Sequence, residues 1–359
     1  MSDFLEVHTS DRIRYKRCRR KWSLASPLRM YLEPTEGREN INLWLGTGFH
    51  FALEDYHGYN RFKDPVKAIE AFYLAFNSDQ RPEDAEEGIA LLMDMMEHYK
   101  NWLRHRDIYR TLWIDGKPQV EVRFALELTE FRGKTSKPVV YRGTLDRLAI
   151  DPEGRYWVQD YKTARSIDLN KLANDPQIGA YVWAAEQYFE VPIEGMLYTQ
   201  FAKKAPKPPK RLVNGGLSVD KRQATTHYLY REALLEQYPN AKFPSKYIEF
   251  LDLLAEKEQP EGDEFIRLDQ VHRNLFSKEK TYEYIIQEVS EMLNPDLPLY
   301  PNPTRDCSWD CTEFRPVCLA MDEGDDYEYL IKEFYRRKEE HDETWRERVK
   351  WPEPEPQTL

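Results

Sequence analysis

The stretch from Tyr141 to Thr163, YRGTLDRLAIDPEGRYWVQDYKT, has the pattern of a β-hairpin. Val139–Ile150 and Arg155–Lys162 are rich in β-branched and aromatic residues, which favour strands. Between them, the DPEG sequence at 151–154 is typical of a type I turn, with proline at its second position and a glycine able to adopt the left-handed conformation. The sequence therefore predicts two antiparallel strands joined by a tight turn.

This turn predicts which side chains of the hairpin lie opposite each other. If Asp151 pairs with Arg155, counting back along the ladder puts Asp146 opposite Asp160. Lys162 projects from the same face as Asp160, because side chains alternate along a strand. Facing carboxylates repel, and a divalent cation between them removes that penalty. With an ammonium group beside them, the arrangement is typical of metal-dependent phosphodiester hydrolysis. A solvated surface hairpin explains this stretch alone equally well.

Length and charge limit the classes of protein to consider. The chain has 359 residues, enough for one large domain or two. It has no apolar run of membrane-spanning length, and its first ten residues, MSDFLEVHTS, are polar. We therefore expect a soluble, cytoplasmic protein with no membrane partner. A net charge of −11 argues against nonspecific nucleic-acid binding by the whole surface, but it allows a local basic groove.

Two stretches of the chain are locally basic. Residues 11–21 contain seven lysines and arginines against one acid. Lys203–Arg211, with the sequence KKAPKPPKR, is also rich in proline and is predicted to be an extended loop. Taken singly, each stretch is also explained as an ordinary solvated surface.

Hydrophobic periodicity predicts a mixed α/β (α+β) fold with a central mixed sheet flanked by helices. The predicted helices are Ser10 to about Leu32 with a break or bend at Pro27, Leu43–Tyr59, Pro65–Phe76, Asp84–Arg106, one beginning at Asp175-Pro176, Gln223–Gln237, Lys246–Lys257 and Lys278–Leu293. The predicted strands outside the hairpin are Gln119–Glu130, Ile193–Ala202 and a short one at Glu264–Leu268. The order in the core is three antiparallel strands, a helix and a further strand.

The predicted domain organisation is a single domain at 1–320 followed by a charged helix and a disordered tail at 321–359. The parts of the domain are a helical part at about 10–110, a core at about 119–202, a helical elaboration at about 203–300 and a cysteine cluster at 301–320. The charged helix is expected within Asp322–Arg348, and the tail reads WPEPEPQTL.

Five short motifs follow one another in the chain, and each is weak alone. They are Gly46-Thr-Gly48-Phe-His50, Gly143-Thr-Leu-Asp146, Asp160-Tyr161-Lys162, Gln177-x3-Tyr181, and Cys18 with Cys307-x3-Cys311-x6-Cys318. In this order they resemble the PD-(D/E)XK nuclease superfamily. More narrowly, they resemble its RecB-type branch, which includes AddB-like recombination nucleases, CRISPR-adaptation nucleases and related phage exonucleases. The resemblance spans about Ser10 to Cys318.

The resemblance implies a metal site for Mg²⁺ or Mn²⁺. Asp146 and Asp160 would bind the ion, and the carbonyl of Tyr161 would complete the inner shell. His50 would add a nitrogen ligand, which somewhat favours Mn²⁺ because imidazole is a softer donor than carboxylate. Glu121, one strand earlier, matches a further acidic position, although an exposed strand glutamate is the ordinary alternative.

The remaining site residues follow from the same resemblance. Lys162 would orient the attacking water and help to deprotonate it. Gln177 and Tyr181, four residues apart on one helix face, would brace the site and contact DNA. Glu54 shares a helix face with His50 and is expected to be structural.

The four cysteines, Cys18, Cys307, Cys311 and Cys318, suit either zinc or a 4Fe–4S cluster. Their spacings miss the paired C-x2-C pattern of zinc ribbons and are one residue longer than those of the RecB-type branch. The branch implies the 4Fe–4S cluster, with structural Zn²⁺ as the alternative. Either metal would join residue 18 to residue 307 and so staple the two ends of the domain.

The expected function is that of a metal-dependent DNA exonuclease in DNA end processing, recombination or repair, encoded by a phage in a bacterial host. A helicase, a recombinase or a single-strand annealing protein is a candidate partner, since the sequence has no G-x4-G-K-[S/T] loop of its own. The alternative is a non-catalytic DNA-binding or partner-recruiting module that keeps the fold and the cluster.

Overall fold

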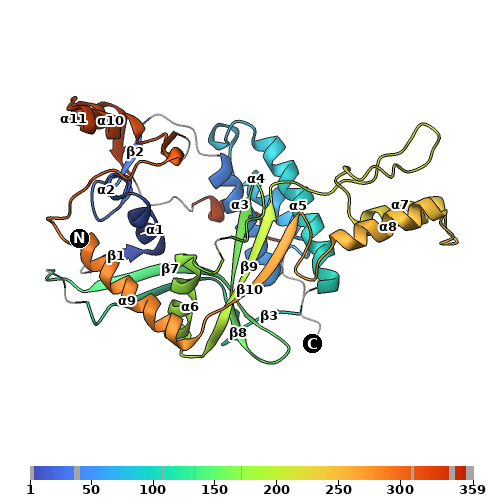
Figure 1. Cartoon of the computed structure of the whole chain (residues 1–359), viewed down its shortest axis with the longest axis horizontal. Helices are drawn as coiled ribbons and strands as arrows, with labels where there is room; N and C mark the ends of the chain where they lie inside the picture. The colour runs from blue at the N-terminus through green and yellow to red at the C-terminus, as the bar shows by residue number, and fades with distance from the viewer. Residues whose placement is uncertain are drawn as a thin grey trace.

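The computed structural model describes residues 4–35, 41–106, 108–131, 133, 135–170, 172–308, 311–338 and 344–352. A mixed sheet lies at the centre, with helices on both faces (Figure 1). Its strands are β1 (Leu5–His8), β3 (Arg110–Thr111), β6 (Val120–Glu127), β7 (Val139–Ile150), β8 (Tyr156–Ala164), β9 (Ile193–Ala202) and β10 (Ile266–His272). The mixed α/β architecture with flanking helices is the predicted one.

The predicted core order is confirmed. Strands β6, β7 and β8 are consecutive and antiparallel, and β9 runs parallel to β8 after helix α6 (Pro176–Phe189). Strand β10 closes the sheet antiparallel to β9, and β1 pairs parallel with the start of β7. The β1 strand was not predicted, because four residues of mixed polarity give no clear alternation. Two small two-stranded sheets pair β2 (Leu32–Pro34) with β11 (Tyr335–Arg337) and β4 (Trp113–Ile114) with β5 (Lys117–Pro118).

The hairpin has the predicted turn and register. The Gly154 amide donates to the Asp151 carbonyl (3.0 Å), and Gly154 is left-handed with a φ of 83°. The ladder of β7 and β8 pairs Ile150 with Tyr156 and ends where Arg147 pairs with Gln159. Asp146 and Asp160 are therefore the next residues along, at the point where the ladder ends.

Two hydrophobic cores lie on opposite faces of the sheet. One is built on α3 (Ile41–His57), α4 (Pro65–Leu74) and α5 (Ala85–Arg106), and the other on α1 (Thr9–Arg17), α6 and α9 (Leu275–Met292). The site-bearing strands are thus buried on both sides. Among the described helices, none is long and apolar enough to cross a membrane.

The predicted helix Ser10–Leu32 is wrong in its continuity. Two helices, α1 and α2 (Arg19–Ala25), meet at Cys18, whose backbone is extended with φ −162° and ψ 116°. The Cys18 sulfur accepts a hydrogen bond from the Lys21 amide (3.4 Å), so the thiol caps the start of α2. The hydrophobic periodicity of the sequence continues through both helices because they follow one another directly. It therefore gives no sign of a break that a capping side chain makes.

The basic stretch at 11–21 is largely paired with acids of α9. Arg12 and Lys16 both contact Glu288, at 2.7 and 2.9 Å, and Arg19 contacts Glu291 at 2.9 Å. These ion pairs hold α1 against α9. The stretch therefore serves packing between helices, and its charge is largely neutralised within the molecule.

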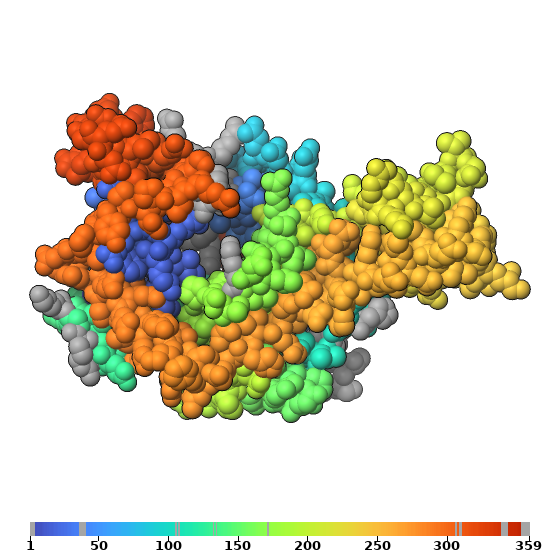
Figure 2. Space-filling view, viewed as in Figure 1, coloured from blue at the N-terminus to red at the C-terminus, as the bar shows by residue number. Residues whose placement is uncertain are grey.

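Residues 205–260 form an arm that projects from the body of the protein (Figures 1 and 2). Its helices are α7 (His227–Gln237) and α8 (Ser245–Lys257), close to the predicted ranges. They enclose a small core of their own, made of Leu217, Tyr230, Leu234, Tyr247, Phe250, Leu251 and Leu254.

The segment after the cysteines is built from short elements where the sequence suggested one charged helix. They are α10 (Arg315–Glu323), α11 (Tyr327–Phe334), β11 and α12 (Trp345–Arg348), and residues 353–359 of the expected tail lie outside the described residues. Trp345 is 4% exposed and packs against Phe51 and Phe72 at ring distances of 5.3 and 4.9 Å. The C-terminal segment therefore covers part of α3. The predicted domain boundaries stay predictions.

The turn of the hairpin gives a prediction for acid stability. The Asp151 carboxylate accepts from the Arg155 amide (2.8 Å), from Arg155 Nε (2.7 Å) and from Trp157 Nε1 (3.0 Å). Burial opposes ionisation, but these bonds outweigh it and lower the pKa of Asp151 to about 2. Since the folded pKa lies below the ordinary value, its stabilisation is present above about pH 4 and is lost as the pH falls towards about 2.

Asp151→Asn is therefore expected to lower the free energy of unfolding by about 1–3 kcal/mol at pH 7 and to flatten its dependence on pH between about 5 and 2.5. Urea unfolding at several pH values measures both effects. Asp252→Asn, at an exposed position of α8, is the matched control. Equal pH slopes for wild type and Asp151→Asn would contradict the prediction.

Candidate active site

The site lies where β7 and β8 separate. The Asp146 carboxylate accepts a hydrogen bond from the Tyr161 amide through Oδ2 (2.8 Å), across the gap between the strands. Lys162 Nζ lies 2.8 Å from both carboxylate oxygens of Asp160. The structure thus brings Asp146, Asp160 and Lys162 to one end of the hairpin, as the register requires.

Two carboxylate side chains and one imidazole converge beside this end of the hairpin. His50 from α3, Glu121 from β6 and Asp146 from β7 have ligand atoms that all lie within 4.8 Å of one another. His50 Nδ1 is 3.5 Å from Glu121 Oε1 and 3.7 Å from Asp146 Oδ1. Two carboxylates and an imidazole suit a divalent cation such as Mg²⁺ or Mn²⁺.

Glu121 has a strained backbone conformation. Its φ is 47°, in the left-handed region that non-glycine residues rarely adopt. The ladder pairs Val120 with Arg147 and Val122 with Leu145, and it skips Glu121. Strain of this kind persists where the surroundings impose it, and it often marks functional sites. At Glu121 this backbone strain accompanies a carboxylate that lies against His50. The alternation of side chains along the strand in the sequence gives no sign of the strain.

Both oxygens of the Asp160 carboxylate face Lys162. Nζ donates a hydrogen bond to Oδ1 and lies 2.8 Å from Oδ2 in an ion pair. The Asp160 side chain is 1% exposed, so Lys162 supplies the charge that offsets a buried carboxylate. Asp160 lies outside the group formed by His50, Glu121 and Asp146.

The charges of the site act strongly on one another. Burial lowers the pKa of His50, but the charges of Asp146 and Glu121 outweigh it and raise the pKa to about 9. Burial raises the pKa of Asp160 to about 6, with Lys162 opposing the rise. Burial lowers the pKa of Lys162, but the two aspartates outweigh it and raise the pKa above its usual range. Without a metal ion, the positive charges of His50 and Lys162 therefore offset the negative charges of the carboxylates.

Helix α6 supplies the last two predicted residues. Asp175 caps the helix through a hydrogen bond from the Gln177 amide to Oδ1 (2.8 Å), as expected from Asp175-Pro176. The Gln177 side chain hydrogen-bonds to the phenol of Tyr181. Burial raises the pKa of that phenol, and the charges of Lys162 and Asp160 act on it in opposite directions. Both residues therefore lie next to the ion pair.

A family model for the PD-(D/E)XK nuclease superfamily matches residues 10–319. The chain belongs to this superfamily. The search of curated proteins gives no match to the chain. PD-(D/E)XK proteins are usually nucleases and generally use divalent metal ions, so membership indicates a metal-dependent nuclease with DNA as its substrate.

Two features of the PD-(D/E)XK motifs have a packing explanation. A Cβ at Gly143 would lie 2.6 Å from the ring of Phe124, so glycine lets β6 and β7 approach beneath the site. The ring of Tyr161 is buried and stacks on His57, with ring centroids 5.9 Å apart and an angle of 16°. This contact fixes the backbone between Asp160 and Lys162, where the Tyr161 carbonyl is the predicted ligand.

Sequence reasoning missed Arg147, the residue next to Asp146. It is 2% exposed and donates to Thr111 Oγ1 (2.9 Å), the Tyr109 carbonyl (2.7 Å) and Gln159 Oε1 (2.9 Å). These bonds lock β7 to β8 just before the strands separate. An arginine on a strand reads as exposed in a sequence, so no signal pointed to it.

The four cysteines of this PD-(D/E)XK chain line one cavity of about 500 Å³. Burial raises the pKa of the Cys311 thiol, Lys21 opposes the rise, and the other three cysteines add to it. The amides of Lys21 and Asn302 donate to Cys18 Sγ, each at 3.4 Å, and the Thr304 amide donates to Cys307 Sγ at 3.4 Å. The structure therefore brings Cys18 and the three later cysteines to one cavity.

Proposed function

We propose that the chain is an Mg²⁺- or Mn²⁺-dependent DNA exonuclease that processes DNA ends in recombination or repair. The observation that carries the proposal is the convergence of His50, Glu121 and Asp146 within 4.8 Å, next to the Asp160–Lys162 ion pair. Neither the three metal-binding side chains nor the ion pair alone would support the proposal, because a cation site without an adjacent ammonium is also found in structural metal sites.

The residues that would hold the divalent ion are His50, Glu121 and Asp146, which converge, and Asp160, whose charge acts on Asp146. A divalent ion bound there supplies a water of lowered pKa and stabilises negative charge on the phosphate. The His50 imidazole must be neutral to act as a ligand, so it must lose the proton that its neighbours favour.

Lys162 is proposed to orient the attacking water and to offset the negative charge that develops on the scissile phosphate. Its raised pKa keeps Nζ protonated at neutral pH, which favours this role over that of a base. The charges of Lys162 and Asp160 act on the phenol of Tyr181, and Gln177 and Tyr181 are proposed to brace the site and contact DNA.

For the cysteines we propose a 4Fe–4S cluster with a structural role. Around tetrahedral zinc, four sulfurs lie only about 3.8 Å apart. Of the described cysteines, no three have sulfurs all within 4.8 Å of one another, a wider spacing than tetrahedral zinc requires. Amide hydrogen bonds to Cys18 and Cys307 suit thiolates that carry negative charge.

End-labelled linear DNA and covalently closed circular DNA, each with Mg²⁺ or Mn²⁺, test the proposed activity. We expect stepwise shortening of the linear DNA, an intact circle and no reaction in EDTA. Cleavage of the circle would reassign the protein as an endonuclease. Binding of DNA without cleavage under any metal condition would leave the non-catalytic binding module as the function.

A further inference from the structure

Residues 203–224 form a narrow two-stranded ribbon between β9 and α7, at the start of the projecting arm. Its two limbs are joined by backbone hydrogen bonds, from the Lys207 amide to the Ala224 carbonyl (2.6 Å) and from the Ser218 amide to the Lys210 carbonyl (2.8 Å). Gly215, with a φ of 80°, closes the turn at the tip. The basic loop predicted from the sequence is therefore one limb of an ordered hairpin-like element, here called the basic ribbon.

The basic ribbon is strongly positive in an acidic protein. It contains seven lysines and arginines and one acid, Asp220, in a chain of net charge −11. The basic residues are Lys203, Lys204, Lys207, Lys210, Arg211, Lys221 and Arg222. Lys207, Lys210 and Lys221 are exposed. The other basic side chains include three that pair with acids: Lys204 with Glu264, Arg211 with Glu236 and Arg222 with Asp220.

The basic ribbon starts beside the candidate active site. Strand β9 pairs Gln200 with Lys162, and three residues later the Lys203 amide donates to the Ala164 carbonyl (2.7 Å). At about 3.3 Å per residue, Lys203 lies some 10 Å beyond Gln200 along the chain. Lys210 lies at most about 35 Å beyond Gln200. From the end of β9 the basic ribbon runs out along the arm (Figure 1).

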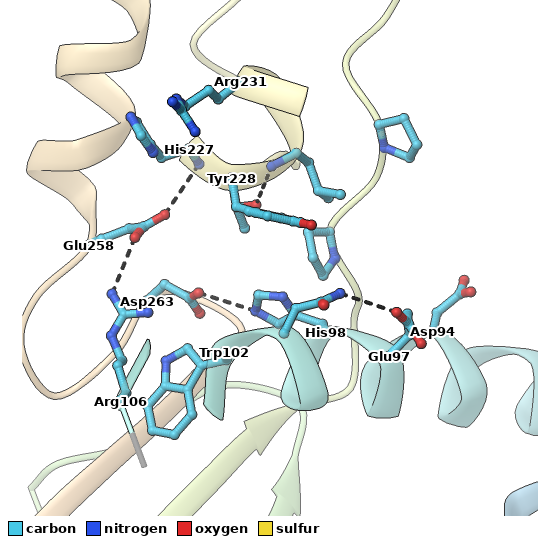
Figure 3. A pocket seen from close by; sticks show the side chains of 15 residues that line it. Asp94, Glu97, His98, Trp102, Arg106, His227, Tyr228, Arg231, Glu258 and Asp263 are labelled. Atoms are coloured by element: carbon cyan, nitrogen blue, oxygen red, sulfur yellow. Dashed lines mark hydrogen bonds and ion pairs between the residues drawn. The ribbon is translucent and has the colours of Figure 1, made fainter. Parts of the chain in front are cut away.

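The arm is anchored at its base on α5. Figure 3 shows the contacts around a cavity of about 600 Å³: Arg106 pairs with Glu258 (3.2 Å), and His98 contacts Asp263 (3.2 Å). Glu258 also accepts from the His227 amide (3.2 Å). Pro206 and Pro208 of the basic ribbon line the same cavity. Proline and these ion pairs restrict the ribbon, so less ordering entropy is lost when it binds a ligand.

We propose that the basic ribbon binds the phosphate backbone of DNA next to the segment that is cut, a role that rests on the proposed nuclease function. Duplex DNA presents about one negative charge per 1.7 Å of axis, and its major groove admits a two-stranded ribbon. The charge, the narrow shape and the position at the end of β9 all match a strand of phosphates leading away from the site. Long DNA is therefore bound more tightly than DNA that reaches only the site.

The test compares Lys207→Glu/Lys210→Glu/Lys221→Glu with a matched control, Lys67→Glu/Lys117→Glu/Lys332→Glu, which makes the same charge change at exposed positions elsewhere. Binding to duplexes of about 40 and about 10 base pairs is measured in EDTA over a range of salt concentrations. For the long duplex, the ribbon variant is expected to bind about 10- to 100-fold more weakly, with a log–log salt slope smaller by about 2–3. Its kcat/KM on the short duplex should stay within about threefold of wild type, and the control should change neither quantity.

Equal weakening by the ribbon and control variants, or an unchanged salt slope in the ribbon variant, would overturn the proposal. These outcomes leave cleavage by the wild type untouched, so the nuclease proposal would survive them. Conversely, a wild type that binds long DNA through the basic ribbon but cuts no DNA would refute the nuclease and support the ribbon. Thermal unfolding of each variant shows that the surface substitutions leave the fold intact.

Discussion

Asp160→Asn and Lys162→Gln are each expected to lower kcat/KM for DNA cleavage by about 10³-fold or more, while DNA binding in EDTA stays close to that of wild type. Both side chains belong to one ion pair, with Lys162 Nζ 2.8 Å from the carboxylate of Asp160. Loss of the carboxylate removes a candidate metal ligand, and loss of the ammonium removes the group that orients water. Because the two act as a unit, the double variant should be little worse than either single one.

Asp160→Asn keeps the shape of the side chain and Lys162→Gln keeps a polar end, but each leaves the other charge of the pair without its partner. For a buried pair this costs about 3–5 kcal/mol, so the fold of each variant is checked. Single-turnover cleavage with Mg²⁺ and with Mn²⁺ measures the effect, and unfolding curves show whether a loss comes from misfolding. Lys332→Gln, at an exposed position of α11 and far along the chain from the site, is the control. Variants that are folded and keep activity within about tenfold would remove Asp160 and Lys162 from the mechanism.

Cys311→Ser and Cys18→Ser are each expected to abolish the broad visible absorbance and the bound iron of anaerobically prepared protein and to lower the melting temperature by about 10 °C. A cluster joining residue 18 to residue 307 closes most of the chain into one loop. By the closure entropy of cross-linked chains, that constraint is worth on the order of 5 kcal/mol.

Iron and sulfide analysis, absorbance and calorimetry on each protein provide the measurements. Ser308→Ala is the matched control, since Ser308 lines the same cavity and carries no thiol. A colourless wild type containing stoichiometric zinc would refute the iron–sulfur cluster. Cysteine variants with an unchanged melting temperature would refute the staple, whichever metal is bound.

The sequence predicted best where local chemistry decides structure. The strand ranges Val139–Ile150 and Ile193–Ala202 are those observed, because β-branched residues and a strong turn specify them locally. Asp175 was recognised as a helix cap for the same reason. Counting back from the turn gave the register of the two strands. This register places Asp146 and Asp160 next to each other at the end of the ladder.

The features that sequence reasoning missed are imposed by tertiary contacts. The helix break at Cys18 depends on a thiol that turns towards cysteines nearly three hundred residues away. The left-handed backbone of Glu121 is held by the neighbouring strand and helix, and strand alternation alone predicts an ordinary extended residue. Arg147 is buried because three backbone and side-chain acceptors from two segments surround it, which no local pattern reveals.

The packing of the C-terminal segment on α3 bears on when the enzyme is completed during synthesis. Helix α3 carries His50; Trp345 packs on Phe51 of this helix, and Arg346 pairs at 2.7 Å with Glu54, on the helix face that His50 shares. The ribosome makes these partners nearly three hundred residues after His50. Contacts so distant in sequence form late and slowly. A nascent chain therefore carries the hairpin long before α3 is secured, and nuclease activity should appear only after the last helix has docked.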